Sequence, residues 1–252
     1  MPNPPSVCVI TGTTGNPKLK KCIESVQEQS YALIDHLVVV DGPEWNEKVD
    51  VILGGLEDQR GVKLIRLPHP TGKNYWNAHR IYGAMPSIAM SDFVCWLDDD
   101  NWFEPEHIES LVASVTASQA AWSFSFRNIV DADGNFIARD ECECLGNLHP
   151  TFQNPNDFHI DANCYLLRRD VAIQLSGVWN RPGFVANELD PDKLLCRVLM
   201  EHFPNGQGTR KYTVNYTVGT TPRSVKADFF LNGNGVMKAR YPQGLPWETA
   251  IA

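Results

Sequence analysis

The sequence predicts an α/β protein in which helices cover both faces of a mostly parallel sheet. In the first part of the chain, short apolar runs alternate with segments whose apolar residues recur at helical spacing, which is typical of βαβ units. The chain of 252 residues, 43% of them hydrophobic, can build one substantial core but not several independent domains. We therefore expect one globular body.

Four apolar runs are the expected strands of the parallel sheet: Val7–Ile10, Leu37–Val40, Val62–Leu67 and Phe93–Leu97. A polar or turn-forming cluster follows each run directly. These clusters are residues 11–17, 41–43, 68–73 and 98–101. Because such sheets bind ligands at the carboxyl ends of their strands, we expect the clusters to converge on one crevice.

Helical spacing is found in three segments near these strands. A helix is expected from Pro17, since residues 19–26 carry one apolar stripe. A second is expected over Asn77–Met90, although Gly83 and Pro86 weaken it. A third follows Pro105, where apolar residues again recur at helical spacing.

The second half has a less regular pattern and is predicted to be α+β. Two β-rich runs, Asn128–Val130 and Phe136–Ala138, flank a turn-forming stretch and predict a hairpin. Asp161–Arg169 and Tyr212–Val218 are further strand candidates. One domain is expected over residues 1–203, with residues 204–252 as a C-terminal extension that folds back on it.

Charge and cysteine content limit the function classes. The formal net charge of −8 argues against sequence-independent nucleic-acid binding, and a phosphorylated substrate would need a metal counterion. The N-terminus shows no secretory signal, no apolar run has the length of a membrane span, and the seven cysteines favour reduced thiols. These observations predict a cytoplasmic protein. Cys142 and Cys144 lie near His149, but no second pair at a suitable spacing supports a zinc site, and their role stays open.

Three consecutive aspartates follow the Phe93–Leu97 strand. Adjacent carboxylates repel one another, so their placement at the end of an apolar strand favours a compensating cation. Asp98 and Asp100, two positions apart, are the expected ligands of Mn²⁺ or Mg²⁺, which would also bind a diphosphate, while Asp99 points elsewhere and can contact a sugar. The alternative is a solvated acidic turn before a helix.

Taken together, Val7–Gly15, Leu37–Pro43 and Phe93–Asn101 resemble the nucleotide-binding half of GT-A-fold glycosyltransferases, and most of all the mostly inverting family 2. The resemblance implies that Thr11 and Thr13 lie at the nucleobase and that Asp41 bonds to it. It also implies that Asp98 and Asp100 are a D-x-D motif for metal and diphosphate. Residues 1–104 would then be the nucleotide-binding half and 105–203 the acceptor half.

Further residues are candidates for the diphosphate. The family often carries Ala-Arg-Asn before the metal strand, whereas this chain has Asn77-Ala78-His79-Arg80, so His79 and Arg80 compete for that role. Lys73 lies in a Thr-Gly-Lys loop without the glycine pattern of a P-loop, which excludes an NTPase assignment. Arg223 and Lys226, after the Tyr212–Val218 strand, could close over the diphosphate. A helix-surface or solvated-loop position is the alternative for each of them.

The general base is expected at the start of a helix. Residues 187–197 resemble the family's helix that opens with an acidic pair, and Asp192 aligns best with its base. Pro191 replaces the preceding glutamate, so Glu188 and Asp190 stay as competitors. Asp190 directly before Pro191 also fits a helix N-cap. A base on the face opposite the leaving nucleotide implies inversion of the anomeric configuration.

The sequence therefore predicts a metal-dependent glycosyltransferase that uses a nucleotide diphosphate sugar. The acceptor could be a glycan, a lipid-linked sugar or a small molecule. One rival is a non-catalytic sugar-nucleotide or glycan-binding module, which would use largely the same residues. The other is a nucleotidyltransferase, which the absence of a Gly-rich basic loop at residues 11–16 disfavours. The nucleobase, the sugar and the oligomeric state stay open.

Overall fold

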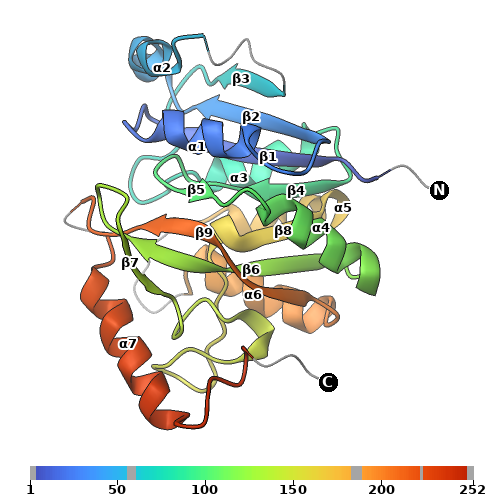
Figure 1. The fold of residues 1–252 in the computed structure, drawn as a ribbon. Helices are drawn as coiled ribbons and strands as arrows, with labels where there is room; N and C mark the ends of the chain where they lie inside the picture. The colour runs from blue at the N-terminus through green and yellow to red at the C-terminus, as the bar shows by residue number, and fades with distance from the viewer. Residues whose placement is uncertain (1–3, 56–60, 183–188, 222–223, 249–252) are drawn as a thin grey trace.

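A computed structural model describes residues 4–55, 61–182, 189–221 and 224–248. These residues form one nine-stranded sheet with the strand order β3-β2-β1-β4-β8-β6-β9-β5, and β7 pairs with β6 (Figure 1). Helices pack on both faces of the sheet. The α/β fold class predicted from the sequence is confirmed.

The first half of the sheet is parallel and contains all four predicted strands. They are β1 (Val7–Thr13), β2 (Ile34–Val40), β3 (Val62–Arg66) and β4 (Phe93–Trp96). The chain moves outward from β1 to β2 and β3 and then returns to place β4 on the other side of β1. The strand order therefore reverses direction between β1 and β4, which is where such sheets bind ligands.

The second half of the sheet is mixed. Its strands are β5 (Trp102–Phe103), β6 (Trp122–Val130), β7 (Phe136–Arg139), β8 (Tyr165–Arg168) and β9 (Gln207–Thr217). The predicted hairpin is present as β6 and β7. β9 lies between β6 and β5, so the chain after residue 203 supplies an interior strand of the same sheet.

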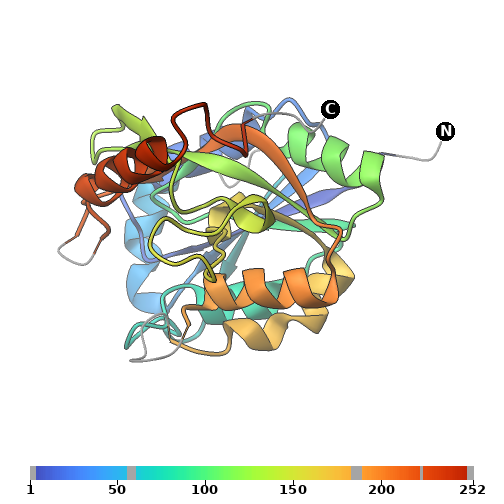
Figure 2. The ribbon, with the colours of Figure 1, turned by 90° about the horizontal axis from the view of Figure 1, so that it is seen from below.

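The helices divide between the two faces. On one face α1 (Leu19–Gln27) packs on β5, α2 (Asn46–Leu53) packs on α1, and α4 (His107–Ser118) packs on β6 and β9. The opposite face carries α3 (His79–Ala84), α5 (Arg169–Gln174) and α6 (Pro191–His202). Figure 2 shows α5 and α6 on the side of the sheet away from α4. α7 (Ala227–Arg240) follows β9.

One predicted helix is shorter in the structure, and another helix was not predicted. The helix expected over Asn77–Met90 is shorter, because α3 ends at Ala84 and a 3₁₀ turn, Met85–Ser87, contains Pro86, which has no N–H to donate. α2 had no sequence signal. Val49 and Leu53 are its buried residues, while Val51 is 83% exposed, so its apolar stripe is narrow.

The hydrophobic core contains several large aromatic side chains. Trp96, Trp122 and Trp179 are almost fully buried between the sheet and the helices. All seven cysteines are free and buried. Among the described residues, no helix has both the length and the apolar character needed to cross a membrane.

Candidate functional site

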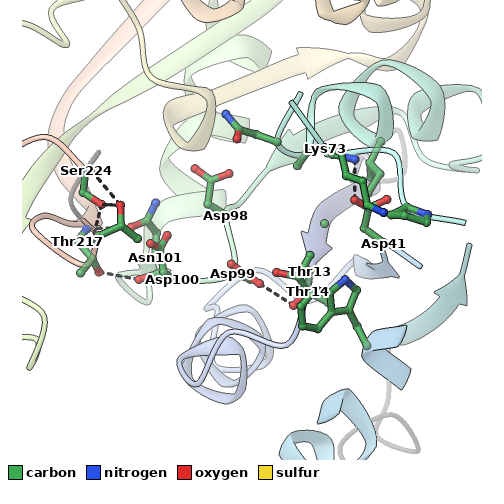
Figure 3. A pocket seen from close by; sticks show the side chains of 18 of the residues that line it. Thr13, Thr14, Asp41, Lys73, Asp98, Asp99, Asp100, Asn101, Thr217 and Ser224 are labelled. Atoms are coloured by element: carbon green, nitrogen blue, oxygen red, sulfur yellow. Dashed lines mark hydrogen bonds between the residues drawn. The ribbon is translucent and has the colours of Figure 1, made fainter. Parts of the chain in front are cut away.

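A cleft of about 640 Å³ opens at the carboxyl ends of β1, β2 and β4. This volume falls within the usual range of ligand pockets, and the position is the point where the strand order reverses. In Figure 3 the acidic turn lies between Thr217 and Ser224 at one end and Thr13, Asp41 and Lys73 at the other. The predicted convergence of polar strand ends is therefore present in the structure.

The backbone of the acidic turn is held from two sides. Leu97 N donates to Ile10 O at 3.0 Å, which continues the β1–β4 pairing to the edge of the cleft. On the other side, Thr217 Oγ1 donates to Asp100 O at 2.6 Å and Thr217 N donates to Asn101 Oδ1 at 2.8 Å. The end of β9 thus fixes the turn that carries the three carboxylates.

The three carboxylates have different neighbours. Asp98 accepts hydrogen bonds from Tyr82 Oη and, at 2.9 Å, from Asn163 Nδ2. Asp99 accepts one from Thr13 Oγ1 at 2.6 Å. Asp100 lines the cleft, and the positive charge of Lys18 acts on its carboxylate.

Burial and mutual repulsion make this cluster costly to ionise. Burial, more than any neighbour, raises the pKa of Asp98, raises that of Asp99 to about 6 and raises that of Asp100 to about 7. The carboxylates of the same turn increase the pKa of Asp99 and Asp100 further. A bound cation would favour the charged forms.

The donor set fits a hard cation that is completed by its substrate. Within the described ranges, no group of three or more His, Cys, Asp or Glu side chains is arranged to hold a metal by itself. Mg²⁺ is commonly bound by one or two carboxylates together with substrate phosphates and water. Asp98 and Asp100 both line the cleft and can supply those carboxylates.

Asp41 lines the cleft but is engaged by a neighbouring loop. Its Oδ1 accepts from Thr71 N at 2.6 Å and from Thr71 Oγ1 at 2.7 Å, and its Oδ2 accepts from Gly72 N at 2.8 Å. Residues 70–77, called the rim loop below, are therefore tied to the end of β2. Lys73 in this loop lines the cleft, as does Trp45, which the sequence analysis did not single out.

Three residues predicted to contact the donor do not line the cleft in this structure. Thr11 belongs to β1 and not to a loop, and its buried hydroxyl pairs with His36 Nε2 at 2.8 Å. His79 is buried beside Trp179, with Nδ1 3.0 Å from Arg181 O. The Arg80 guanidinium stacks on Trp76 at 3.5 Å and donates to Thr71 O. Each of these side chains thus has a partner within the protein, and their roles in donor binding stay predictions.

The loop after β9 reaches the cleft through Thr221 and Ser224. Lys226 donates to Thr221 O at 2.8 Å and so binds within its own loop. Lys226 does not line the cleft, and its contact with a diphosphate stays a prediction. Arg223 lies outside the described residues.

The predicted base region is partly described. α6 begins at Pro191 with the exposed Asp190 at the N-cap position, and the Asp190 side chain makes no capping hydrogen bond. Asp192 is half-buried, and its Oδ2 accepts from Ala162 N at 3.3 Å. Burial, followed by the charges of Asp161 and Asp98, raises its pKa well above the ordinary value. Glu188 lies outside the described residues.

Several residues that bind Asp98 or lie behind it had no predicted role. Tyr82 and Asn163 bind Asp98, and Asp161 bonds to Asn163 and to the buried Arg127. One signal was present, because Arg127 is a charged residue in a strand rich in aromatic side chains, and charged residues are rarely buried unless paired.

Comparisons with known proteins give one family and one group of structures. The family model described as Glycosyl transferase family 2 matches residues 6–176. The structure of S. aureus TarS 1-349 matches with a TM-score of 0.58 and 14% identity over 84% of this chain. TarS 1-349 in complex with UDP-GlcNAc matches with 0.56 and 14% over 93%, and the complex with UDP with 0.52 and 15% over 85%.

The chain spans 60%, 65% and 61% of these three TarS chains, respectively. At this identity the likeness shows a shared fold, the GT-A fold. No curated protein sequence matches the chain.

Proposed function

This chain belongs to glycosyltransferase family 2, and from that membership we propose that it transfers a sugar from a nucleotide diphosphate sugar to an acceptor hydroxyl. The observation that carries the proposal is the Asp98–Asp100 turn in the cleft where the strand order reverses. The TarS complexes with UDP-GlcNAc and UDP, in the same fold, support a UDP-sugar as the first donor to test.

The cleft offers distinct surroundings for the parts of such a donor. At one end, Trp45 offers an aromatic face for a nucleobase, and Lys73, which also lines the cleft, offers a positive charge. At the acidic turn, Asp98 and Asp100 would hold Mn²⁺ or Mg²⁺. The bound cation would supply positive charge to the diphosphate and to the nucleotide that leaves. Asp99, which accepts a hydrogen bond from Thr13, lies beside them.

Asp192 is the proposed general base. A raised pKa makes a carboxylate a stronger proton acceptor, and burial raises the pKa of Asp192 above its ordinary value. The charge of Asp98 acts on Asp192, so the proposed base and the proposed metal ligand lie near each other. Attack by the deprotonated hydroxyl on the anomeric carbon, with departure of the nucleotide diphosphate, would invert the configuration.

The proposal is tested by titrating UDP and UDP-GlcNAc into the protein with and without Mn²⁺ and by measuring UDP release. We expect Mn²⁺ to strengthen UDP binding, and Asp100→Ala to abolish that dependence because it removes a cation ligand. The matched control is Asp228→Asn, an exposed aspartate in the first turn of α7, which should behave as wild type.

Two results would contradict parts of the proposal. Unchanged Mn²⁺ dependence in Asp100→Ala would remove the metal assignment. Tight binding of nucleotide sugars without any release or transfer, across a panel of donors and acceptors, would point to a non-catalytic binding module.

A further inference from the structure

One short segment touches both carboxylates that the proposed reaction uses. Residues 161–163, called the hinge segment below, lead into β8. Asn163 clamps Asp98, because its Oδ1 accepts from Asp98 N at 2.6 Å and its Nδ2 donates to Asp98 Oδ2 at 2.9 Å. Ala162 N donates to Asp192 Oδ2 at 3.3 Å. A displacement of this segment would therefore move the contacts of both carboxylates.

A buried guanidinium holds the hinge segment from behind. Arg127, on β6, is 2% exposed, and its Nη1 donates to Asp161 Oδ2 at 2.5 Å. Its Nε donates to Asp140 at 2.8 Å and its Nη2 donates to Glu143 at 2.7 Å. The guanidinium also lies over the ring of Tyr216, 4.3 Å from its centroid. Five N–H donors in a fixed planar fork can bind several carboxylates in set directions, which an ammonium cannot do.

Asp161 links Arg127 to the Asn163 side chain that binds Asp98. Its Oδ1 accepts from Asn163 N at 3.0 Å and from Asn163 Nδ2 at 2.6 Å. The Asn163 amide therefore bridges Asp161 and Asp98 with one nitrogen, and its side chain is fully buried. Arg127 also supplies positive charge close to several carboxylates, which stabilises their ionised forms in a buried region.

We propose that Arg127 is a positioning residue of the transfer reaction: through Asp161 it fixes the hinge segment, and the hinge segment sets the Asp98 carboxylate and the Asp192 carboxylate relative to each other. This inference rests on the proposed function. It assigns two routes from Arg127, one to Asp98 through the Asn163 side chain and one to Asp192 through the Ala162 backbone.

The two routes make a double-mutant test possible. The variants are Arg127→Lys, Asn163→Ala and the pair, and the measurements are the Kd of UDP with Mn²⁺ and the rate of UDP release from UDP-GlcNAc. Asn163→Ala should raise the Kd about tenfold, because hydrogen bonds to a charged group are lost. Arg127→Lys should raise the Kd about fivefold alone but less than about twofold when Asn163 is already alanine.

The rate should respond differently. The route to Asp192 uses a backbone N–H, so Arg127→Lys should lower UDP release about tenfold in both backgrounds. If Arg127 acted only on folding, Arg127→Lys would not lose its effect on the Kd in the Asn163→Ala background while it keeps its effect on the rate of UDP release. Glu143→Gln is the matched control, since it removes another ion pair of the same guanidinium and leaves the Asp161 bond in place. We expect it to change the Kd less than about twofold.

The outcomes separate the inference from the function on which it rests. A double variant that raises the Kd of UDP by the product of the two single-variant fold-changes would show that Arg127 does not position Asp98 through this segment. The same conclusion follows if folded Arg127→Lys matches wild type in both the Kd and the rate. If circular dichroism shows that Arg127→Lys does not fold, Asp161→Asn is measured instead. We expect it to raise the Kd of UDP alone but to have little effect on the Kd when Asn163 is already alanine. Wild-type protein that binds no UDP with Mn²⁺ and releases none from UDP-GlcNAc would instead overturn the proposed UDP-sugar function.

Discussion

The aspartates around the cleft have different hydrogen-bond partners, and these partners indicate different roles. Asp41 accepts three hydrogen bonds from the rim loop, whereas Asp100 lines the cleft and the charge of Lys18 acts on its carboxylate. Asp41 therefore holds a loop, whereas Asp98, although Tyr82 and Asn163 bind its oxygens, lines the cleft beside Asp100 and is a proposed metal ligand. Residue type and position alone do not distinguish these two situations.

Asp192→Asn tests the base at the scale of a single residue. We expect UDP affinity to stay at the wild-type value while transfer falls about 10²- to 10⁴-fold, because a positioned base acts on the acceptor and not on the donor. Transfer is measured as the rate of product formation. NMR of the wild-type product should show an anomeric configuration opposite to that of the donor. Asp190→Asn, at the exposed N-cap, is the control and should keep most of the activity. Full turnover in Asp192→Asn together with loss in Asp190→Asn or Glu188→Gln would move the base.

Asp41→Asn tests whether this residue reads the nucleobase directly. The amide keeps one oxygen that accepts, but its NH₂ cannot accept, so either Thr71 or Gly72 loses its acceptor and we expect the rim loop to be held less firmly. Binding of UDP, GDP and ADP should then weaken by a similar factor, measured by calorimetric titration. Selective loss of a single nucleotide would show instead that Asp41 recognises the base, as the family resemblance implied.

Elements predicted from local patterns agree with the structure, and those that depend on distant partners differ. Buried strands such as Phe93–Trp96 have an apolar run that is visible in the sequence. The pairing of Thr11 with Val38 extends β1 beyond its apolar run and buries a residue that was expected in a loop. Asn163 and Asp98 are 65 residues apart in the chain, so no local pattern could predict their contact.

The rim loop carries a second constraint, at Gly72. A Cβ at this position would lie 2.4 Å from Asn77 O and 2.8 Å from Asp41 Oδ2, and the backbone oxygen can yield only if the loop moves. We expect Gly72→Ala to weaken UDP binding about tenfold with little loss of global stability, because the strain falls on a surface loop. Gly177→Ala is the control, since its added Cβ would meet nothing within 4 Å. Equal UDP affinity in the two variants would show that the rim loop does not shape the nucleotide site.

At the scale of the whole molecule, buried titratable groups act in opposite directions on stability. Burial lowers the pKa of His36 and of His107 to about 3, and it raises the pKa of Asp99 and Asp100 above that of an ordinary carboxyl. Below about pH 6.5 an unfolded chain protonates both histidines while the folded chain does not, so acid destabilises the fold through them. The Asp99 and Asp100 carboxyls stay protonated to a higher pH in the folded chain than in the unfolded chain, so acid stabilises the fold through them.

His107→Gln isolates one of these contributions. His107 is fully buried, stacks on Phe103 at 3.8 Å and pairs with Thr213 Oγ1 at 2.8 Å, so its neutral form is built into the interface of α4 with β9. Between pH 6 and pH 4.5 the wild-type free energy of unfolding loses about 1.4 kcal/mol per pH unit through this residue, on top of the other groups. The variant should therefore show a slope of free energy against pH that is smaller by that amount, measured by urea unfolding at several pH values without metal. The exposed His202 supplies the control His202→Gln, whose slope should equal that of wild type. An unchanged slope in His107→Gln would mean that the folded protein protonates His107 as readily as the unfolded chain does.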